Sequence, residues 1–342
     1  MKTTALIMAG GKGERFWPKS RVNMPKQFLS LTDDGKTMIQ LTVERISPLV
    51  DIKDVYVATN KNYRELVKQQ LPGIPEENIL CEPVGRNTAP CVGLGAVHVA
   101  SKYDDAVMIV LPSDHLIKNN EVFADTFKEA VQIAEEGANL VTVGITPNYP
   151  ETGYGYIKYN QDDKNLETAK SYLADGTYLW NSGMFVWKVS TILDCFKKFM
   201  PDTYEGLLKI KAAVGTADEN AVLEAEFPNL ESQSVDYGIM EKADSIYTLP
   251  GNFGWDDVGS WLAVGRIKKN DDNSNVINGN VVAVNTRGCV IEGGEKLIAT
   301  VGLRDIVVVD TKDATLITTK ENAGEIKQVL AKLREEGKNE YL

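Results

Sequence analysis

Residues 6–29 of this 342-residue chain read L-I-M-A-G-G-K-G-E-R-F-W-P-K-S-R-V-N-M-P-K-Q-F-L, and this stretch decides the fold class. The apolar run at residues 4–8 is typical of a strand buried on both faces of a parallel sheet. It leads directly into Gly10, Gly11 and Gly13, where backbone amides can turn toward a bound group because no Cβ stands in the way. Amides arranged in this way bind phosphate oxygens. The stretch therefore predicts an α/β domain with a phosphate-binding loop after its first strand.

The predicted loop is basic, although the chain as a whole is acidic. Residues 1–30 hold six Lys or Arg and one acid, Glu14, whereas the net charge of the whole chain is -11. A run of charge is often only a solvated face, but its place directly after a buried strand favours a polyphosphate site. We expect Arg15 and Lys26 to contact the phosphates and to lie on open, non-helical backbone, because Pro18 and Pro25 interrupt the stretch.

Two common nucleotide-binding loops do not match. The G-x-x-x-x-G-K-[ST] pattern is absent, and Phe16 occupies the third glycine position of G-x-G-x-x-G. The prolines also oppose the helix that follows this loop in nicotinamide-dependent dehydrogenases. An oxidoreductase is therefore the weaker alternative, and binding of NADH by the protein would support it.

The composition, with 43% hydrophobic and 25% charged residues, is ordinary for a soluble globular protein. No apolar run approaches the roughly 20 residues of a membrane span, and no signal peptide precedes the first strand. The acidic balance opposes nucleic-acid binding. The four cysteines lack C-x-x-C spacing, which opposes a zinc site and favours a reduced protein. We expect a cytoplasmic protein with neither a membrane nor a nucleic acid as partner.

The first half of the chain alternates between strand and helix patterns. Strands are predicted at residues 4–8, 55–59, 79–81, 106–111 and 140–144, and helices at 37–46, 62–71, 88–101 and 122–136. This alternation predicts a Rossmann-like, mostly parallel sheet with helices on both faces. Ligands of such sheets bind at the carboxyl ends of the strands, where the loops after residues 8, 81 and 111 meet.

The pattern of apolar and turn residues changes twice in the second half of the chain. Residues 152–267 are less regular, with strands predicted at 154–159 and 184–187 and helices at 191–199 and 203–213. After residue 273, short β-branched runs separated by Gly, Asn and Asp turns predict a small all-β module, which a charged helix at 323–336 closes. We expect a catalytic domain over residues 1–268 and a C-terminal module over 269–342.

Two acidic positions are candidate metal ligands. Asp114 follows Ser113 at the end of a strand and would face the phosphate loop, and Asp257 lies in the loop W-D-D-V-G-S-W. Mg²⁺ prefers one or two carboxylates plus phosphate oxygens, so the two acids would suit it if they meet. Each has a plainer explanation, since Asp114 can cap the next helix and the second loop can be a solvated turn.

Two further segments carry polar groups suited to a base and to a sugar. E-P-V-G-R-N-T-A-P at residues 82–90 places Glu82 and Arg86 in a loop shaped by Pro and Gly, while Asn87 or Thr88 can cap the following helix. The strings at residues 151–158 and 180–185 combine aromatic faces, glycines, an amide and an ammonium, as a phosphorylated sugar would require. The aromatic residues can equally belong to the core.

Taken together, these strings resemble the sugar-nucleotide pyrophosphorylases, most closely the branch that makes GDP-mannose. The matching strings are M-A-G-G-K-G-E-R-F-W-P-K-S-R, P-K-Q-F-L, E-P-V-G-R-N-T-A-P, L-P-S-D-H, T-G-Y-G-Y-I, W-N-S-G-M-F and W-D-D-V-G-S-W. They occur in family order over roughly residues 4–261. The resemblance implies that GTP and mannose 1-phosphate give GDP-mannose and pyrophosphate, with Mg²⁺ as cofactor.

The resemblance also implies roles for individual residues. Arg15 and Lys26 would be catalytic cations, and Asp114 and Asp257 the metal ligands. The implied nucleotide-binding residues are Gly10, Gly11, Gly13, Glu82, Pro83, Arg86, Asn87, Thr88 and Ser113. The implied sugar-binding residues are Gly153, Lys158, Asn181 and Ser182. The C-terminal module would correspond to a truncated left-handed β-helix that pairs subunits into a homodimer.

One departure from the family pattern concerns the sugar side. Relatives usually carry an E-K-P segment before the helix that leads to W-N-S-G, and here the stretch after Lys158 is shortened. Another sugar 1-phosphate or NTP, or a non-catalytic nucleotide-sugar sensor, therefore remains an alternative. The chain also ends too early for the cupin-type isomerase domain of bifunctional relatives, which predicts the single-function form.

Overall fold

The computed structural model describes residues 1–151, 153–157 and 178–342, in two compact units. The first unit comprises Met1–Gly10, Thr42–Ser113 and Ile117–Trp255. The second comprises Gly11–Leu41, Asp114–Leu116 and Asp256–Leu342. Units defined by packing in this way need not follow the chain, so the domain boundary at residues 268 and 269 remains a prediction.

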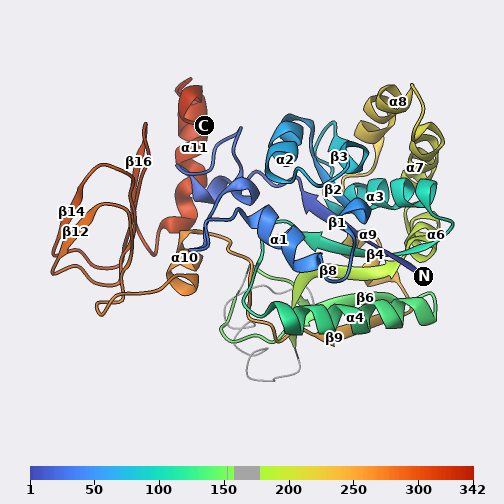
Figure 1. Ribbon diagram of the computed structural model, residues 1–342. Coiled ribbons are helices and arrows are strands. Elements are labelled where there is room, and N and C mark those ends of the chain that lie inside the picture. Colours follow the sequence, from blue (N-terminus) through green and yellow to red (C-terminus); the bar gives the residue numbers. More distant parts are fainter. Residues whose placement is uncertain (152, 158–177) are drawn as a thin grey trace. The chain divides into compact units, whose positions relative to one another are not determined.

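The first unit is built on an eight-stranded sheet of order β3-β2-β1-β4-β8-β6-β9, with β7 paired to β8 (Figure 1). The strands are β1 (Lys2–Ala9), β2 (Val55–Asn60), β3 (Ile79–Glu82), β4 (Ala106–Pro112), β6 (Leu140–Ile145), β7 (Tyr156–Ile157), β8 (Leu179–Lys188) and β9 (Ile246–Pro250). All neighbours pair in parallel except those of β8, which runs antiparallel to β4, β6 and β7. The predicted mostly parallel sheet is confirmed.

Helices follow the strands as the alternation predicted. They are α1 (Met38–Ile46), α2 (Arg64–Gln70), α3 (Thr88–Lys102), α4 (Asn120–Glu136), α6 (Val189–Phe199), α7 (Pro201–Ala213), α8 (Glu219–Glu226), α9 (Val235–Gly238), α10 (Trp261–Ile267) and α11 (Ile326–Glu335). None of these helices is long and apolar enough to cross a membrane. Two more short strands, β5 (Leu116–Ile117) and β10 (Trp255–Asp256), lie where the chain passes between the units.

The core of the first unit forms around α3, which is almost entirely buried. Two glycines allow this close packing, because a Cβ on Gly95 would lie 2.6 Å from Leu6 and one on Gly93 would lie 2.5 Å from Leu207. Helix α3 thereby rests on β1 and against α7, while α4 packs on β6 and β8 (Figure 1). This packing fixes the sheet edge from which the predicted loops leave.

The second unit combines the glycine-rich loop with the C-terminal module. Its strands are β11 (Val276–Asn278), β12 (Val281–Val284), β13 (Val290–Glu292), β14 (Ile298–Val301), β15 (Ile306–Asp310) and β16 (Thr315–Thr319). Strands β11, β13 and β15 stack in parallel, as do β12 and β14, which gives the coiled arrangement expected of a β-helix-like module. Phe16 and Trp17 of the loop lie in the same hydrophobic core as Val290 and Leu330 of the module.

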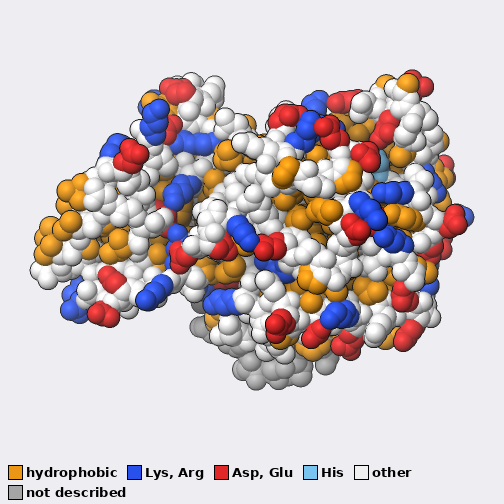
Figure 2. Space-filling model, in the orientation of Figure 1, with side chains coloured by type: hydrophobic (Ala, Val, Ile, Leu, Met, Phe, Trp, Pro, Cys, Tyr) orange, Lys and Arg blue, Asp and Glu red, His pale blue; other side chains and the backbone are white. Residues whose placement is uncertain are grey.

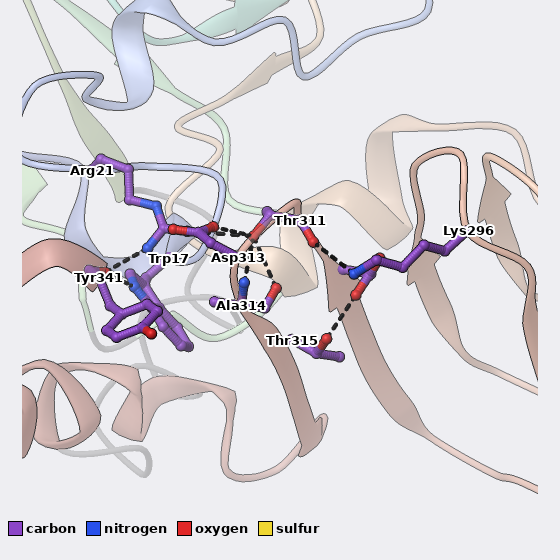
Figure 3. Close-up of polar contacts among 9 residues, drawn as sticks. Trp17, Arg21, Lys296, Thr311, Asp313, Ala314, Thr315 and Tyr341 are labelled. Atoms are coloured by element: carbon purple, nitrogen blue, oxygen red, sulfur yellow. Dashed lines mark hydrogen bonds and ion pairs between the residues drawn. The ribbon is translucent and has the colours of Figure 1, made fainter.

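Polar contacts also anchor the loop to the module. The indole of Trp17 donates a hydrogen bond of 2.6 Å to the carbonyl oxygen of Tyr341, and the Arg21 guanidinium donates to the same oxygen and to Asp313 (Figure 3). The buried Glu292 carboxylate accepts from Lys19, at 2.5 Å, and from Lys268, at 2.9 Å. Because these partners are far apart in the sequence, the module supports the conformation of the loop.

The structure corrects one local prediction. Arg15 and Lys26 were expected on non-helical backbone, but each lies in a single turn of 3₁₀ helix, at Glu14–Phe16 and Lys26–Phe28. Such a turn needs few residues, and Pro25 supplies a fixed φ at the N-cap of the second one. The predicted strand at 154–159 appears as β7, and its last two residues lie outside the described ranges.

Candidate active site

The glycines after β1 differ in what each position requires. Gly13 has a φ of 60°, and a Cβ there would lie 2.5 Å from the backbone nitrogen and the Cβ of Lys26. Gly11 has open space on its Cβ side, and its carbonyl accepts a hydrogen bond from Gln27. In the first unit, a Cβ on Gly10 would lie 3.0 Å from a carboxylate oxygen of Glu82. Gly13 is therefore required for the approach of Lys26, whereas a side chain at position 10 would only press on the end of the Glu82 side chain.

A cavity of about 320 Å³ opens within the second unit beside this loop. Its lining residues are Lys12, Gly13, Glu14, Arg15, Phe16, Lys26, Asp114, His115, Asp257, Gly259 and Lys327. Five of the residues predicted from the sequence thus line one cavity: Gly13, Arg15, Lys26, Asp114 and Asp257. Lys12 and Lys327 also line it, and the sequence reasoning had not selected them.

Lys26 joins the two predicted acidic positions. Its side chain is almost fully buried, and its ammonium lies 2.9 Å from a carboxylate oxygen of Asp114. It also donates a 2.6 Å hydrogen bond to the backbone carbonyl of Asp257. Burial acts to raise the pKa of Asp114, but the charges of Lys26 and His115 outweigh it and hold that pKa below its usual value. Asp114 is therefore a carboxylate at neutral pH.

Of the two adjacent acids in the W-D-D-V-G-S-W loop, only Asp257 lines the cavity. Its carboxylate accepts a hydrogen bond of 3.1 Å from the Gly259 amide. The Asp256 carboxylate instead accepts from both Arg266, at 3.0 and 3.1 Å, and the Val258 amide. Asp256 therefore shapes the loop.

The cavity suits a divalent metal ion that a bound substrate helps to hold better than a metal held by protein ligands alone. Among the described residues there is no cluster of three or more His, Cys, Asp or Glu side chains that would hold a metal without a substrate. Asp114 and Asp257 supply two carboxylates, and cations of the cavity would bind phosphate groups. Mg²⁺ in phosphate-transfer sites takes one or two carboxylates together with substrate phosphate oxygens. The donor set therefore fits a divalent metal ion bound together with phosphate groups.

The predicted base-binding loop belongs to the first unit and is partly structural. Arg86 donates a hydrogen bond to the carbonyl of Pro228, and Asn87 caps α3 through the Thr88 amide. The Thr88 hydroxyl accepts from the amide of Val235. For Asn87 the plainer capping interpretation therefore holds, and Arg86 and Thr88 anchor the loop to neighbouring segments.

Glu82 is the exception in this loop. Its side chain is 5% exposed, and burial raises its pKa to about 7. The neighbouring Pro83 is buried as well. The buried Glu82 carboxyl group, with so little hydrogen bonding, is suited to accept donors from a ligand.

Ser113 directly follows β4. Its amide donates a hydrogen bond to the carbonyl of Met8, and its carbonyl accepts one from the Thr42 hydroxyl.

The predicted sugar-binding residues also lie in the first unit, except that Lys158 falls outside the described residues. The Asn181 amide donates a 2.7 Å hydrogen bond to Asp236, which the sequence reasoning missed because no recognisable motif surrounds it. The Ser182 hydroxyl donates to the carbonyl of Val143 inside the sheet. The Gly153 amide donates to the Glu151 side chain. Asn181 and Asp236 therefore form a positioned polar pair, and Ser182 has a structural role.

The aromatic residues of this region form a cluster. Trp180 is 2% exposed, so the core interpretation holds for it. The rings of Tyr149 and Tyr154 meet it edge-on, at centroid distances of 4.8 and 5.1 Å. Tyr154 also contacts Trp255 edge-on. The partly exposed Tyr154 remains available as an aromatic face for a ligand.

The raised pKa of Glu82 predicts a pH-dependent stability. Between the usual pKa of about 4.5 and about 7, the folded protein binds this proton more tightly than the unfolded chain, so stability falls as pH rises through that window. The Glu82→Gln variant has no ionisable group at this position and should not lose stability in this way. We therefore expect the free energy of unfolding of the variant minus that of wild type to rise by up to about 3 kcal/mol between about pH 5 and about pH 8. Denaturant unfolding at both pH values measures the difference. Glu77→Gln, at an exposed position, is the control and should show no such trend. Parallel pH curves for wild type and Glu82→Gln would contradict the burial of an ionisable carboxyl at this position.

Comparison with family models matches two parts of the chain. Residues 4–274 match the nucleotidyl transferase family, and residues 279–333 match a family described as the mannose-phosphate isomerase/GMP-like β-helix domain. The second match agrees with the β-helix-like stacking of the C-terminal strands. Enzymes of the nucleotidyl transferase family generally use a divalent metal, in agreement with the donor set of the cavity.

Individual relatives agree with these matches. A mannose-1-phosphate guanylyltransferase of Salmonella montevideo is 39% identical over 99% of this chain and 75% of that protein. The enzyme of the same name from Escherichia coli K12 is 38% identical over the same shares. A crystal structure from Thermus thermophilus, described as a mannose-1-phosphate geranyltransferase, aligns with a TM-score of 0.87 and 35% identity over 98% of this chain and 100% of that one. The chain therefore belongs to the nucleotidyl transferase family of enzymes, in the group that contains the mannose-1-phosphate guanylyltransferases.

Proposed function

We propose that the chain transfers GMP from GTP to α-D-mannose 1-phosphate, giving GDP-mannose and pyrophosphate, with Mg²⁺ as the divalent metal. The observation that carries this proposal is the cavity in which Lys26 holds Asp114 and the Asp257 backbone beside Arg15. The names of its relatives identify the same reaction. Because the proposed reaction consumes a nucleoside triphosphate, we propose that the protein acts in the cytoplasm.

The reaction requires one displacement at the α-phosphorus of GTP. An oxygen of the mannose 1-phosphate attacks this phosphorus, and the bond to the bridging oxygen of the β-phosphate breaks, so pyrophosphate leaves with that oxygen. The attacking phosphate is already anionic, so no nucleophile or strong base of the protein is needed. Catalysis then depends on positioning and on charge neutralisation.

Residues of the second unit would perform these two tasks. Arg15 is exposed at the cavity and can bind phosphate oxygens, and the Gly13 turn brings Lys26 to the acids. Lys26 contributes its charge and also positions Asp114 and Asp257, the proposed metal ligands. When bound, Mg²⁺ would neutralise phosphate charge that these cations leave uncompensated.

Residues of the first unit would select the base and the sugar. Guanine offers an N1–H and an amino group as donors, and the Glu82 carboxyl group is a buried acceptor for them. A base without these donors would leave the acceptor unpaired. On the sugar side, the Asn181–Asp236 pair and the face of Tyr154 can bind hydroxyl groups and the ring. Gly153 and Lys158 complete the proposed set.

A substrate panel tests the proposal. We expect pyrophosphate release with GTP and mannose 1-phosphate, and a kcat/KM for ATP lower by about 10²-fold or more, because the unpaired acceptor rejects adenine. With fewer polar groups on the sugar side, glucose 1-phosphate should react within about tenfold of mannose 1-phosphate, the equivalent of one hydrogen bond. A preference for UTP or dTTP would assign the chain to another branch of the family. Tight GDP-mannose binding without any turnover would instead support a sensor.

Variants of the cavity test the roles of individual residues. Arg15→Ala and Lys26→Ala should each lower kcat by about 10²-fold or more, because a cation that neutralises developing charge is lost. Asp114→Asn and Asp257→Asn should abolish Mg²⁺-dependent turnover. Asp256→Asn is the matched control for the second acid, since its carboxylate binds Arg266. It should retain the Mg²⁺ concentration dependence of wild type, and loss of that dependence in Asp256→Asn alone would reverse the assignment of the two acids.

We further propose that the C-terminal module joins two copies of the chain into a homodimer. The outer face of β12 and β14 carries exposed apolar side chains, among them Val282 at 51%, Val284 at 47% and Val301 at 70%. Val284 and Val301 are paired neighbours on the two strands. Figure 2 shows hydrophobic side chains gathered over these strands. A contiguous apolar face of this kind, with open strand edges, favours association of like surfaces.

The homodimer has a direct test. We expect light scattering after size exclusion to give twice the mass of the chain for wild type, and the mass of one chain for the double variant Val284→Lys/Val301→Lys, because burying two charges is unfavourable. Val329→Lys replaces an exposed apolar residue of α11 outside this face and should remain dimeric. A monomeric wild type, or a double variant that stays dimeric, would contradict the proposal.

A further inference from the structure

The charged residues of the cavity fall into paired and unpaired groups. Lys26 is paired with Asp114 at 2.9 Å, and Glu14 is paired with Arg334 at 2.8 Å. Within the described part of the chain, Lys12, Arg15 and Lys327 have neither an ion pair nor a hydrogen bond through their side chains. The cavity therefore presents three cations without an ion-pair partner among the described residues, against one further carboxylate, that of Asp257. Such a surplus attracts a polyanion.

Lys327 comes from a part of the chain remote from the signature motifs. It lies in the first turn of α11, the helix that closes the C-terminal module. Helix α11 is fixed against the glycine-rich loop, because Ile326 and Leu330 share a hydrophobic core with Phe16 and Trp17. The Glu14–Arg334 ion pair joins the same two segments, and Arg334 thereby compensates the charge of the acidic residue in the loop. The position of Lys327 at the cavity is therefore set by packing.

We propose that Lys327 binds the β- and γ-phosphates of GTP, and hence the pyrophosphate that leaves. This inference rests on the proposed function for the identity of the polyanion. Most of the negative charge of GTP at neutral pH lies on these two phosphates, and they match a cavity with surplus cations. GDP-mannose does not contain these two phosphates, because its second phosphate comes from mannose 1-phosphate. A lysine on an exposed helix face is a flexible point charge, which suits a group that must be bound and then released.

The test compares Lys327→Gln with Lys332→Gln, which removes the same charge from the same helix outside the cavity. We expect Lys327→Gln to raise two KM values by about tenfold: that for GTP in the forward reaction and that for pyrophosphate in the reverse reaction. A change of this size corresponds to the loss of one charge-assisted hydrogen bond. The KM values for mannose 1-phosphate and GDP-mannose should stay within about twofold. Lys332→Gln should match wild type, and Lys327→Arg should restore most of the loss.

A binding measurement separates this inference from the proposed function. Calorimetric titration of wild type and both glutamine variants with inorganic pyrophosphate and Mg²⁺ requires no turnover. Binding by wild type that weakens about tenfold in Lys327→Gln alone supports the role of Lys327, even if GTP and mannose 1-phosphate prove not to be the substrates. Equal affinity in Lys327→Gln and wild type overturns the inference while leaving the proposed function intact. An equal loss in Lys332→Gln, or an equal rise in the KM for GDP-mannose, also overturns it, because the effect would then be one of general charge.

Discussion

The buried ammonium of Lys26, held between the Asp114 carboxylate and the Asp257 carbonyl, is the interaction on which the cavity depends. A buried lysine is stable only when its charge is matched, and the partly exposed Asp114 carboxylate supplies that match. Each partner therefore fixes the other, and with them two loops that are distant in the sequence. The approach is close enough that residue 13 has to be glycine. The ring of Phe16, 5.8 Å from the ammonium, closes one side of the site.

The loop that carries Lys26 is supported from the C-terminal module. Phe16 and Trp17 are buried in the core of that module, and Lys19 reaches the buried Glu292. A basic loop without such support would repel itself and sample many conformations, because its own segment contains few acids. The module is therefore part of the scaffold that holds the loop at the cavity. This explains why the glycine-rich loop and the C-terminal β strands form one compact unit although the first family match covers most of the chain.

The chemistry of phosphoryl transfer explains the choice of residues. Since the attacking and leaving groups are both phosphates, the protein has to hold anions together and neutralise them. Arg15 and the lysines of the cavity supply positive charge, and the charge of Lys26 holds the pKa of Asp114 below its usual value against the effect of burial. In the proposed reaction the first unit would instead select the substrates, through buried polar groups such as Glu82. Selection by buried groups is strict because an unpaired acceptor is unfavourable.

The sequence by itself determined the order of strands and helices in the first half of the chain and the glycine-rich loop after β1. These depend on local patterns, since an apolar run followed by glycines has few alternative structures. It also identified Arg15, Lys26, Asp114 and Asp257 as candidates, because each lies in a recognisable motif. Only the tertiary structure decided that Asp257 lines the cavity while Asp256 binds Arg266, and that Asn87 caps a helix. It alone brought in Asp236 and Lys327, which lie in no motif. Their positions depend on packing between segments far apart in the chain, and neither hydrophobic periodicity nor spacing within one segment carries that information.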